Sequence, residues 1–151
     1  MIEIALRQAI LANPEVVSYI GDRLYPVAVP EGAPYPLIVY ERTSTTRSYT
    51  MQQSDGLCVA TVDLKILMAP RAGVEQYHEL KKLANYVRLA VDGFTQRSPQ
   101  ANSTGATRIT YVMVANENDD VFAPAHAEGE DSLGVQLTLN VAYSEPVRSY
   151  L

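Results

Sequence analysis

Residues 21–45 read Gly-Asp-Arg-Leu-Tyr-Pro-Val-Ala-Val-Pro-Glu-Gly-Ala-Pro-Tyr-Pro-Leu-Ile-Val-Tyr-Glu-Arg-Thr-Ser-Thr, and this stretch decides how the fold begins. Gly21 is a suitable end for a preceding helix. Residues 24–27 predict a short edge strand, because their proline cannot donate a hydrogen bond to a sheet. Three prolines and a glycine make residues 30–36 irregular. Residues 37–45 alternate and are rich in β formers, which predicts a strand.

The flanking segments predict two helices before this stretch and a long strand after it. Apolar side chains at helical spacing predict a helix over residues 2–13. Asn13 and Pro14 are suited to cap and start a second short helix that ends near Ile20. Residues 57–68 predict the longest strand, with one core-facing row formed by Cys58, Ala60, Val62, Leu64, Ile66 and Met68.

The second half of the chain predicts one long helix and two more strands. Residues 73–92 carry an apolar stripe at helical spacing, made of Tyr77, Leu80, Leu83, Ala84, Val87 and Val91. Residues 108–115 and 134–143 predict strands. We therefore expect one α+β domain over residues 1–151, a mostly antiparallel sheet packed on one face by two main helices, with long loops.

The composition is that of an ordinary folded domain. Hydrophobic residues make up 47% of the chain, charged residues 19%, and the net charge is −5. This charge argues against nonspecific wrapping of nucleic acid, which needs clustered Lys and Arg. The single cysteine, Cys58, rules out an internal disulfide and fits a reducing compartment. Since no signal peptide or apolar membrane segment is evident, we expect no membrane partner.

One acidic segment stands out late in the chain. No Lys or Arg lies between Arg108 and Arg148, and the acidic residues there include Glu117, Asp119, Asp120, Glu128, Glu130 and Asp131. We expect residues 116–133 to form a long loop, and loops of this length usually have a purpose. The spacing does not match an EF-hand, which weakens a cation-site interpretation. A solvated loop or a surface for a partner is the better interpretation.

A second polar segment, residues 46–56, ends in Asp-Gly and predicts a hairpin loop or flexible arm between two central strands. It carries Arg47, Tyr49 and Met51 among small polar residues. The segment is either a mobile hairpin tip or an arm that packs on a neighbouring subunit. These three residues are therefore candidate interface residues.

No familiar motif for catalysis, nucleotides or metals occurs in the sequence. His78 and His126 are far apart, and His78 lies beside the apolar stripe of the long helix. Cys58 falls on the core face of its strand, which favours a buried thiol over a nucleophile. Asn102-Ser103-Thr104 matches a glycosylation pattern by chance, since no secretory signal accompanies it. We expect a protein without catalytic, cofactor or metal sites.

The order of several segments carries a resemblance to a known family. An N-terminal helical stretch leads into Gly21-Asp-Arg-Leu-Tyr-Pro26, and Gly32-Ala-Pro-Tyr-Pro-Leu-Ile-Val-Tyr40 enters a strand. The long helix ends in an alanine- and valine-rich run that closes on Asp92-Gly93, and the acidic piece 116–122 precedes a final alternating strand. Together these resemble the tail-completion or tail-terminator (head-to-tail joining) proteins of long-tailed bacteriophages. Residues 98–106 and 125–129 are individual to this chain.

The resemblance implies a structural role. Members of the family form or join a six-fold ring at the head-proximal end of the tail tube, stop its elongation and help join it to the head. The implied partners are copies of the chain in a homo-hexameric ring, the tail tube protein, and a head-completion or connector protein. The protein would be assembled in the host cytoplasm and end in the virion tail. DNA would pass through the lumen without specific binding. An acidic lumen would repel it, so Glu117, Asp119 and Asp120 are candidate lumen residues.

Two alternatives stay open at this point. A head–tail connector or neck protein would differ from a terminator in its partner rather than in its class. A small oligomeric ligand-binding module or enzyme could use the same α+β layer. That alternative needs convergent polar groups in a pocket and a strongly perturbed titrating residue, for which the sequence gives no candidates.

Overall fold

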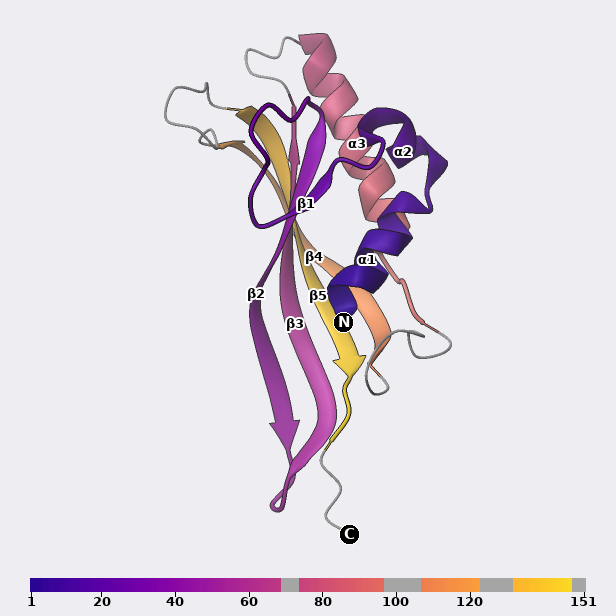
Figure 1. Ribbon diagram of the computed structural model, residues 1–151, viewed down its shortest axis with the longest axis vertical. Coiled ribbons are helices and arrows are strands. Elements are labelled where there is room, and N and C mark those ends of the chain that lie inside the picture. The colour runs from indigo at the N-terminus through magenta and orange to yellow at the C-terminus, as the bar shows by residue number, and fades with distance from the viewer. Residues whose placement is uncertain (69–73, 97–106, 123–131, 148–151) are drawn as a thin grey trace.

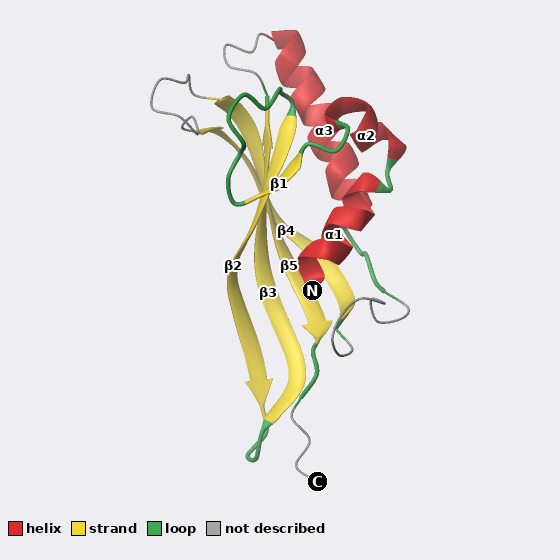
Figure 2. Cartoon of the chain, in the orientation of Figure 1, coloured by secondary structure: helices red, strands yellow, loops and turns green. Residues whose placement is uncertain are grey.

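The computed structural model describes residues 1–68, 74–96, 107–122 and 132–147. Within these ranges the chain forms a five-stranded sheet with three helices on one of its faces (Figures 1 and 2). The elements are α1 (Ile2–Leu11), α2 (Pro14–Ile20), β1 (Leu24–Pro26), β2 (Leu37–Tyr49), β3 (Ser54–Leu67), α3 (Val74–Val91), β4 (Arg108–Phe122) and β5 (Ser132–Ser144). The strand order is β1-β2-β3-β5-β4. All neighbouring strands are antiparallel except β1 and β2, so the predicted α+β fold is confirmed.

The helices begin and end where local chemistry requires. The side chain of Asn13 accepts a hydrogen bond from the backbone N–H of Glu15 at 2.9 Å, and Pro14 occupies the first turn of α2. This capping ends the first helix at Leu11, two residues before the predicted end. The helices α1 and α2 both pack on α3. The buried positions of α3 are Leu80, Leu83, Ala84, Val87 and Val91.

The main core lies between the helices and the central strands. Alternate residues of β3 are buried, as their period of two predicts. The facing residues of β5 are buried in the same register, and they are Val135, Leu137, Leu139, Val141 and Tyr143. Tyr77 departs from the predicted stripe of α3, because it is only half-buried and its hydroxyl bonds to β4.

A second, smaller core lies on the back face, which is the face of the sheet turned away from the helices. Leu37, Val39 and Leu67 alternate with core-facing residues and would be exposed on a bare sheet. They are buried instead by side chains of β1 and the proline-rich segment, namely Tyr25, Val29, Ala33 and Tyr35. The irregular stretch 27–36 thus covers one end of the back face, and the Tyr35–Pro36 peptide in it is cis.

Two predicted loops are shorter than expected because the strands run into them. β2 continues to Tyr49 and β3 starts at Ser54, so most of residues 46–56 is a paired hairpin. β4 continues through the acidic residues to Phe122, which pairs with Ser132 of β5. The polar composition misled both predictions, since strand pairing with a neighbour overrides weak local β-propensity.

Gly56 supports a close crossing between the hairpin and the C-terminal segment. Its φ is +82°, its carbonyl accepts from the N–H of Glu145 at 2.9 Å, and a Cβ there would lie 2.8 Å from the Glu145 carbonyl oxygen. Gly32 shares the positive φ, at +76°, but has nothing within 4 Å of that position. The two glycines therefore separate backbone strain from crowding.

We predict that Gly56→Ala lowers the free energy of unfolding by roughly 2–4 kcal/mol, because left-handed strain and a backbone clash add together. Gly32→Ala should cost only about 1–2 kcal/mol from the strain term. Urea unfolding followed by circular dichroism measures both values. Equal losses would show that the crossing at Glu145 does not constrain the hairpin.

Candidate interaction surfaces

The β2–β3 hairpin projects beyond the rest of the sheet (Figure 1). The last β3–β5 pair is Leu57 with Ser144, whereas β2 and β3 stay paired out to Tyr49 and Ser54. The turn is closed by the N–H of Thr50, which donates to the carbonyl of Gln53 at 2.8 Å. We call residues 49–53 the hairpin tip. Tyr49 is 69% exposed there and Met51 is fully exposed.

Arg47 lies apart from Tyr49 and Met51, although the sequence grouped all three. It is opposite Cys58 in the β2–β3 register, and its Nε donates to Glu145 Oε1 at 2.5 Å. The hydrogen bond from Arg47 lowers the pKa of the Glu145 carboxyl. Arg47 therefore ties the hairpin to the C-terminal segment of its own chain, while Tyr49 and Met51 face outward.

The acidic end of β4 is attached to α3 by an ion-pair cluster. Lys81 Nζ lies 2.9 Å from Asp119 Oδ1 and 3.7 Å from Glu117 Oε1. The hydroxyl of Tyr77 donates to Asp119 Oδ2 at 2.6 Å. The hydrogen bonds from Tyr77 and then Lys81 lower the pKa of Asp119. We call these four residues the β4 clamp.

The other acidic candidates do not join the β4 clamp. Asp120 follows Asp119 in the strand, is exposed, and accepts a hydrogen bond from the N–H of Val121. Glu128, Glu130 and Asp131 lie outside the described residues. The structure therefore brings together Glu117 and Asp119, whose charges are partly balanced by Lys81.

The β4 clamp should make stability pH-dependent at acid pH. The folded pKa of Asp119 is below its ordinary value of 3.8, so the pairing stabilises the fold above that value and is lost as the pH falls through the folded pKa. Asp119→Asn should therefore lower the free energy of unfolding at pH 7 by about 0.2–1 kcal/mol, because exposed ion pairs are screened by solvent.

Urea unfolding of the wild type and Asp119→Asn at pH 7 and pH 3 tests this prediction. The difference between them should shrink at the lower pH. Asp120→Asn is the matched control and should match the wild type at both pH values, since the amide oxygen can keep the bond to Val121. A pH-independent difference would contradict the assignment to the Asp119 charge.

Two further polar contacts join helices to their neighbours and were not predicted. Arg42 forms a bidentate pair with Glu3, with both N···O distances at 2.7 Å, and its guanidinium lies 5.7 Å from the Tyr143 ring centroid. The hydroxyl of Tyr19 donates to Glu79 at 2.5 Å, which raises the pKa of Tyr19 to about 12. In the sequence, each of these polar residues lies beside the apolar positions of its own helix or strand. That periodicity predicts an exposed side chain, but it does not predict which residue of another element the side chain will contact.

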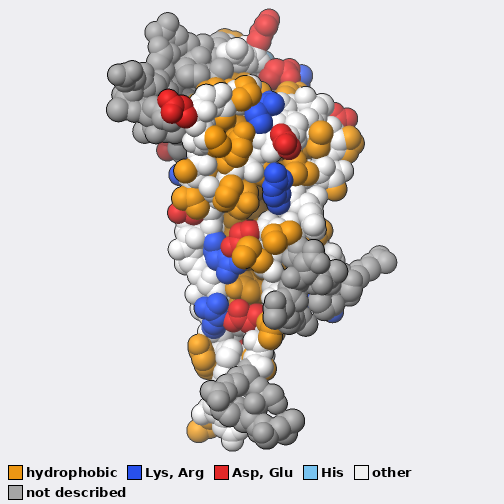
Figure 3. Space-filling view, in the orientation of Figure 1, with side chains coloured by type: hydrophobic (Ala, Val, Ile, Leu, Met, Phe, Trp, Pro, Cys, Tyr) orange, Lys and Arg blue, Asp and Glu red, His pale blue; other side chains and the backbone are white. Residues whose placement is uncertain are grey.

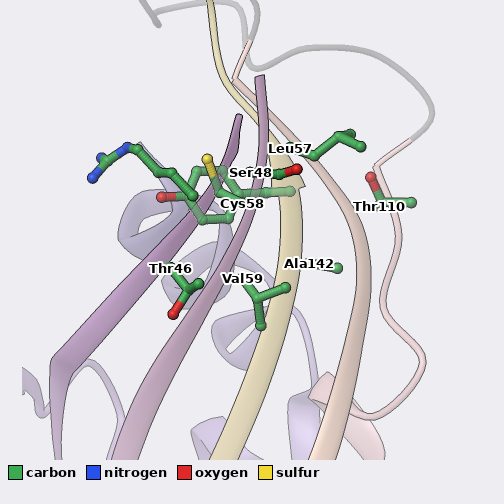
Figure 4. Close-up of a pocket in the computed structure, with 9 residues that line it drawn as sticks. Thr46, Ser48, Leu57, Cys58, Val59, Thr110 and Ala142 are labelled. Carbon is green, nitrogen blue, oxygen red and sulfur yellow. The ribbon is translucent and has the colours of Figure 1, made fainter. Parts of the chain in front are cut away.

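An apolar patch remains on the uncovered part of the back face. We call Leu57, Val59, Tyr111, Met113 and Ala142 the back-face patch. The first four are large apolar residues that are 46–58% exposed. A pocket of about 310 Å³ opens at this end of the sheet (Figure 4). Its lining includes three members of the patch, Leu57, Val59 and Ala142, and six other residues, which are Thr46, Arg47, Ser48, Cys58, Thr110 and Tyr143.

On the face of the molecule seen in Figure 3, charged side chains are distributed rather than gathered. Acidic and basic groups lie beside one another on that face, interspersed with apolar ones.

In the described ranges, no group of three or more His, Cys, Asp or Glu side chains could hold a metal ion. Cys58 is buried, as predicted, and burial raises the pKa of its thiol. No helix of the described part of the chain is long and apolar enough to cross a membrane.

This α+β layer is a fold already seen in a virus-like particle. A chain from "Virion of native gene transfer agent (GTA) particle" superposes with a TM-score of 0.66 over 92% of this chain and 91% of that chain. The two are 14% identical, so the likeness shows the fold. No curated protein matches the sequence.

The family is shown by the sequence itself. The family described as "Tail completion protein gp17" matches residues 4–120, from α1 to the acidic end of β4. The chain belongs to this family, and the resemblance expected from the order of its segments is confirmed. A structural role in a phage tail, as a component of the virion, follows from that membership.

Proposed function

We propose that the protein is a tail terminator, which caps the head-proximal end of the tail tube as a homo-hexameric ring, stops elongation and helps join tail to head. The observation that carries the proposal is the family match over residues 4–120. The role is that of a scaffold without catalysis. Its other partners would be the tail tube protein and a head-completion or connector protein, and assembly would take place in the host cytoplasm.

The sheet offers two dissimilar edges for such a ring. β4 is an edge strand along residues 108–122, and β1 covers β2 only as far as Tyr40, which leaves residues 41–49 at the other edge. A ring requires that one surface meets a different surface on the next copy. The two edges of this sheet differ from each other, and together with the projecting hairpin tip they supply surfaces of that kind.

A tube-capping assay tests this function. Tail tubes assembled from purified tube protein should stop growing when the protein is added, and negative-stain electron microscopy should show a ring at one end. Tail tubes assembled without the candidate terminator are the control. A head–tail connector would instead bind heads and leave tube lengths unchanged, and that result would overturn the terminator proposal.

We further propose that the acidic end of β4, which carries Glu117, Asp119 and Asp120, lies at the lumen, where its negative charge keeps DNA from adhering. The triple variant Glu117→Gln, Asp119→Asn, Asp120→Asn should then slow DNA exit severalfold in a fluorescence ejection assay. Lys81→Met is the matched control, because it removes both ion pairs of the β4 clamp while keeping all three acidic charges. Unchanged ejection in the triple variant, or equal slowing in the control, would contradict a lumen role.

A further inference from the structure

We propose that the hairpin tip of one copy seats in the back-face patch of the next copy, with Met51 over Ala142. This inference rests on the proposed ring and names both halves of a contact within it. The tip supplies a projecting apolar side chain, and the patch supplies a hollow of matching chemistry. Each copy carries one of each.

The hairpin tip is built to project. Met51 is fully exposed and Tyr49 is 69% exposed, although large apolar side chains are usually buried at least in part. The Thr50–Gln53 hydrogen bonds close the turn. Since the tip is already ordered by this closure, seating it elsewhere would cost less conformational entropy than ordering a free loop. An unbranched methionine also adapts to an irregular hollow.

The back-face patch has a low point at Ala142. The register aligns Thr46 with Val59, Val59 with Ala142, and Ala142 with Tyr111 in one row across four strands. Ala142 is the smallest residue of that row and is flanked by two larger ones, so the surface dips there. The pocket of about 310 Å³ that includes Ala142 in its lining is large enough for a methionine side chain (Figure 4).

The two surfaces are matched in charge. Residues 49–53 are uncharged, and so is every member of the back-face patch, in a chain where 19% of residues are charged. The pocket lining adds one charged residue, Arg47, whose guanidinium is already paired with Glu145. Bringing the two surfaces together therefore leaves no unpaired charge away from water, which keeps the desolvation penalty low. A neutral apolar centre is also the usual composition of the core of an interface.

The occupant is a second copy because a tip cannot reach its own patch. The hairpin strands stay paired to Tyr49 and Ser54, and the tip points beyond the end of the sheet (Figure 1). The patch lies instead on the face of the sheet, as the β3–β5 and β4–β5 registers place it. Tip and patch are different surfaces, so their contact is head-to-tail and can close into a ring. A five-residue tip buries far less than the roughly 1,000 Å² of a stable interface, so the contact needs ring closure or a tube end.

Disulfide trapping tests the contact. In a Cys58→Ala background, Met51→Cys with Ala142→Cys should form disulfide-linked multimers up to six copies under mild oxidation, in solution or on added tail tubes. The matched control pairs Met51→Cys with Leu89→Cys, since Leu89 is 58% exposed on α3, outside the patch. That pair should link no more than random collision allows. A ladder no stronger than the control, with and without tubes, would overturn the proposal.

Side-chain replacements give an independent readout. Met51→Ser, and Ala142→Leu, which fills the hollow, should each raise the protein concentration needed for rings or tube capping at least tenfold. Met51→Leu should match the wild type, and circular dichroism should show all three folded. If the wild type forms rings and caps tubes but the Met51→Cys, Ala142→Cys variant forms no disulfide above the control, the tip contact alone is overturned. A wild type that caps nothing would overturn the proposed function, and so the two failures can be told apart.

Discussion

The unbroken pairing of β3 with β5 is the constraint on which the rest of the structure depends. Its register runs from Leu57 opposite Ser144 to Leu67 opposite Gly134 without a shift. Side chains alternate across a strand, so this one register decides which residues of both strands face α3 and which face outward. The outer pairs, β2 with β3 and β4 with β5, each carry two register shifts. Irregularity is thus confined to the strands at or near the edges, where bulges are tolerated.

The sequence was sufficient for the elements that bury a regular apolar face. The alternation in β3 and the stripe in α3 predicted both elements and most of their buried residues, because burial of a periodic face is a local property. The far ends of β2 and β4 could not be predicted in the same way. Residues 46–49 and 116–120 are mostly polar, and they become strands because a neighbouring strand satisfies their backbone groups.

The candidate site residues were predictable as exposed and polar, but not in their pairings. Lys81 and Asp119 are far apart in sequence, and only the packing of α3 near β4 brings them together. The same holds for Arg47 and Glu145. Contacts of this kind separate candidates that a local pattern groups together. Arg47 and Asp119 hold their own chain, whereas Met51 and Tyr49 have large exposed surfaces to offer a partner.

The uneven covering of the back face links the fold to assembly. At one end the proline-rich segment buries Leu37, Val39 and Leu67, so these apolar side chains are covered within a single copy of the chain. At the other end the segment does not reach, and the back-face patch stays in water. A sheet of this length needs cover on both faces wherever its residues are apolar, and the described part of the chain supplies only some of that cover. The uncovered end coincides with the projecting hairpin, so the surface that needs a partner and the element that can reach one lie at the same end of the molecule.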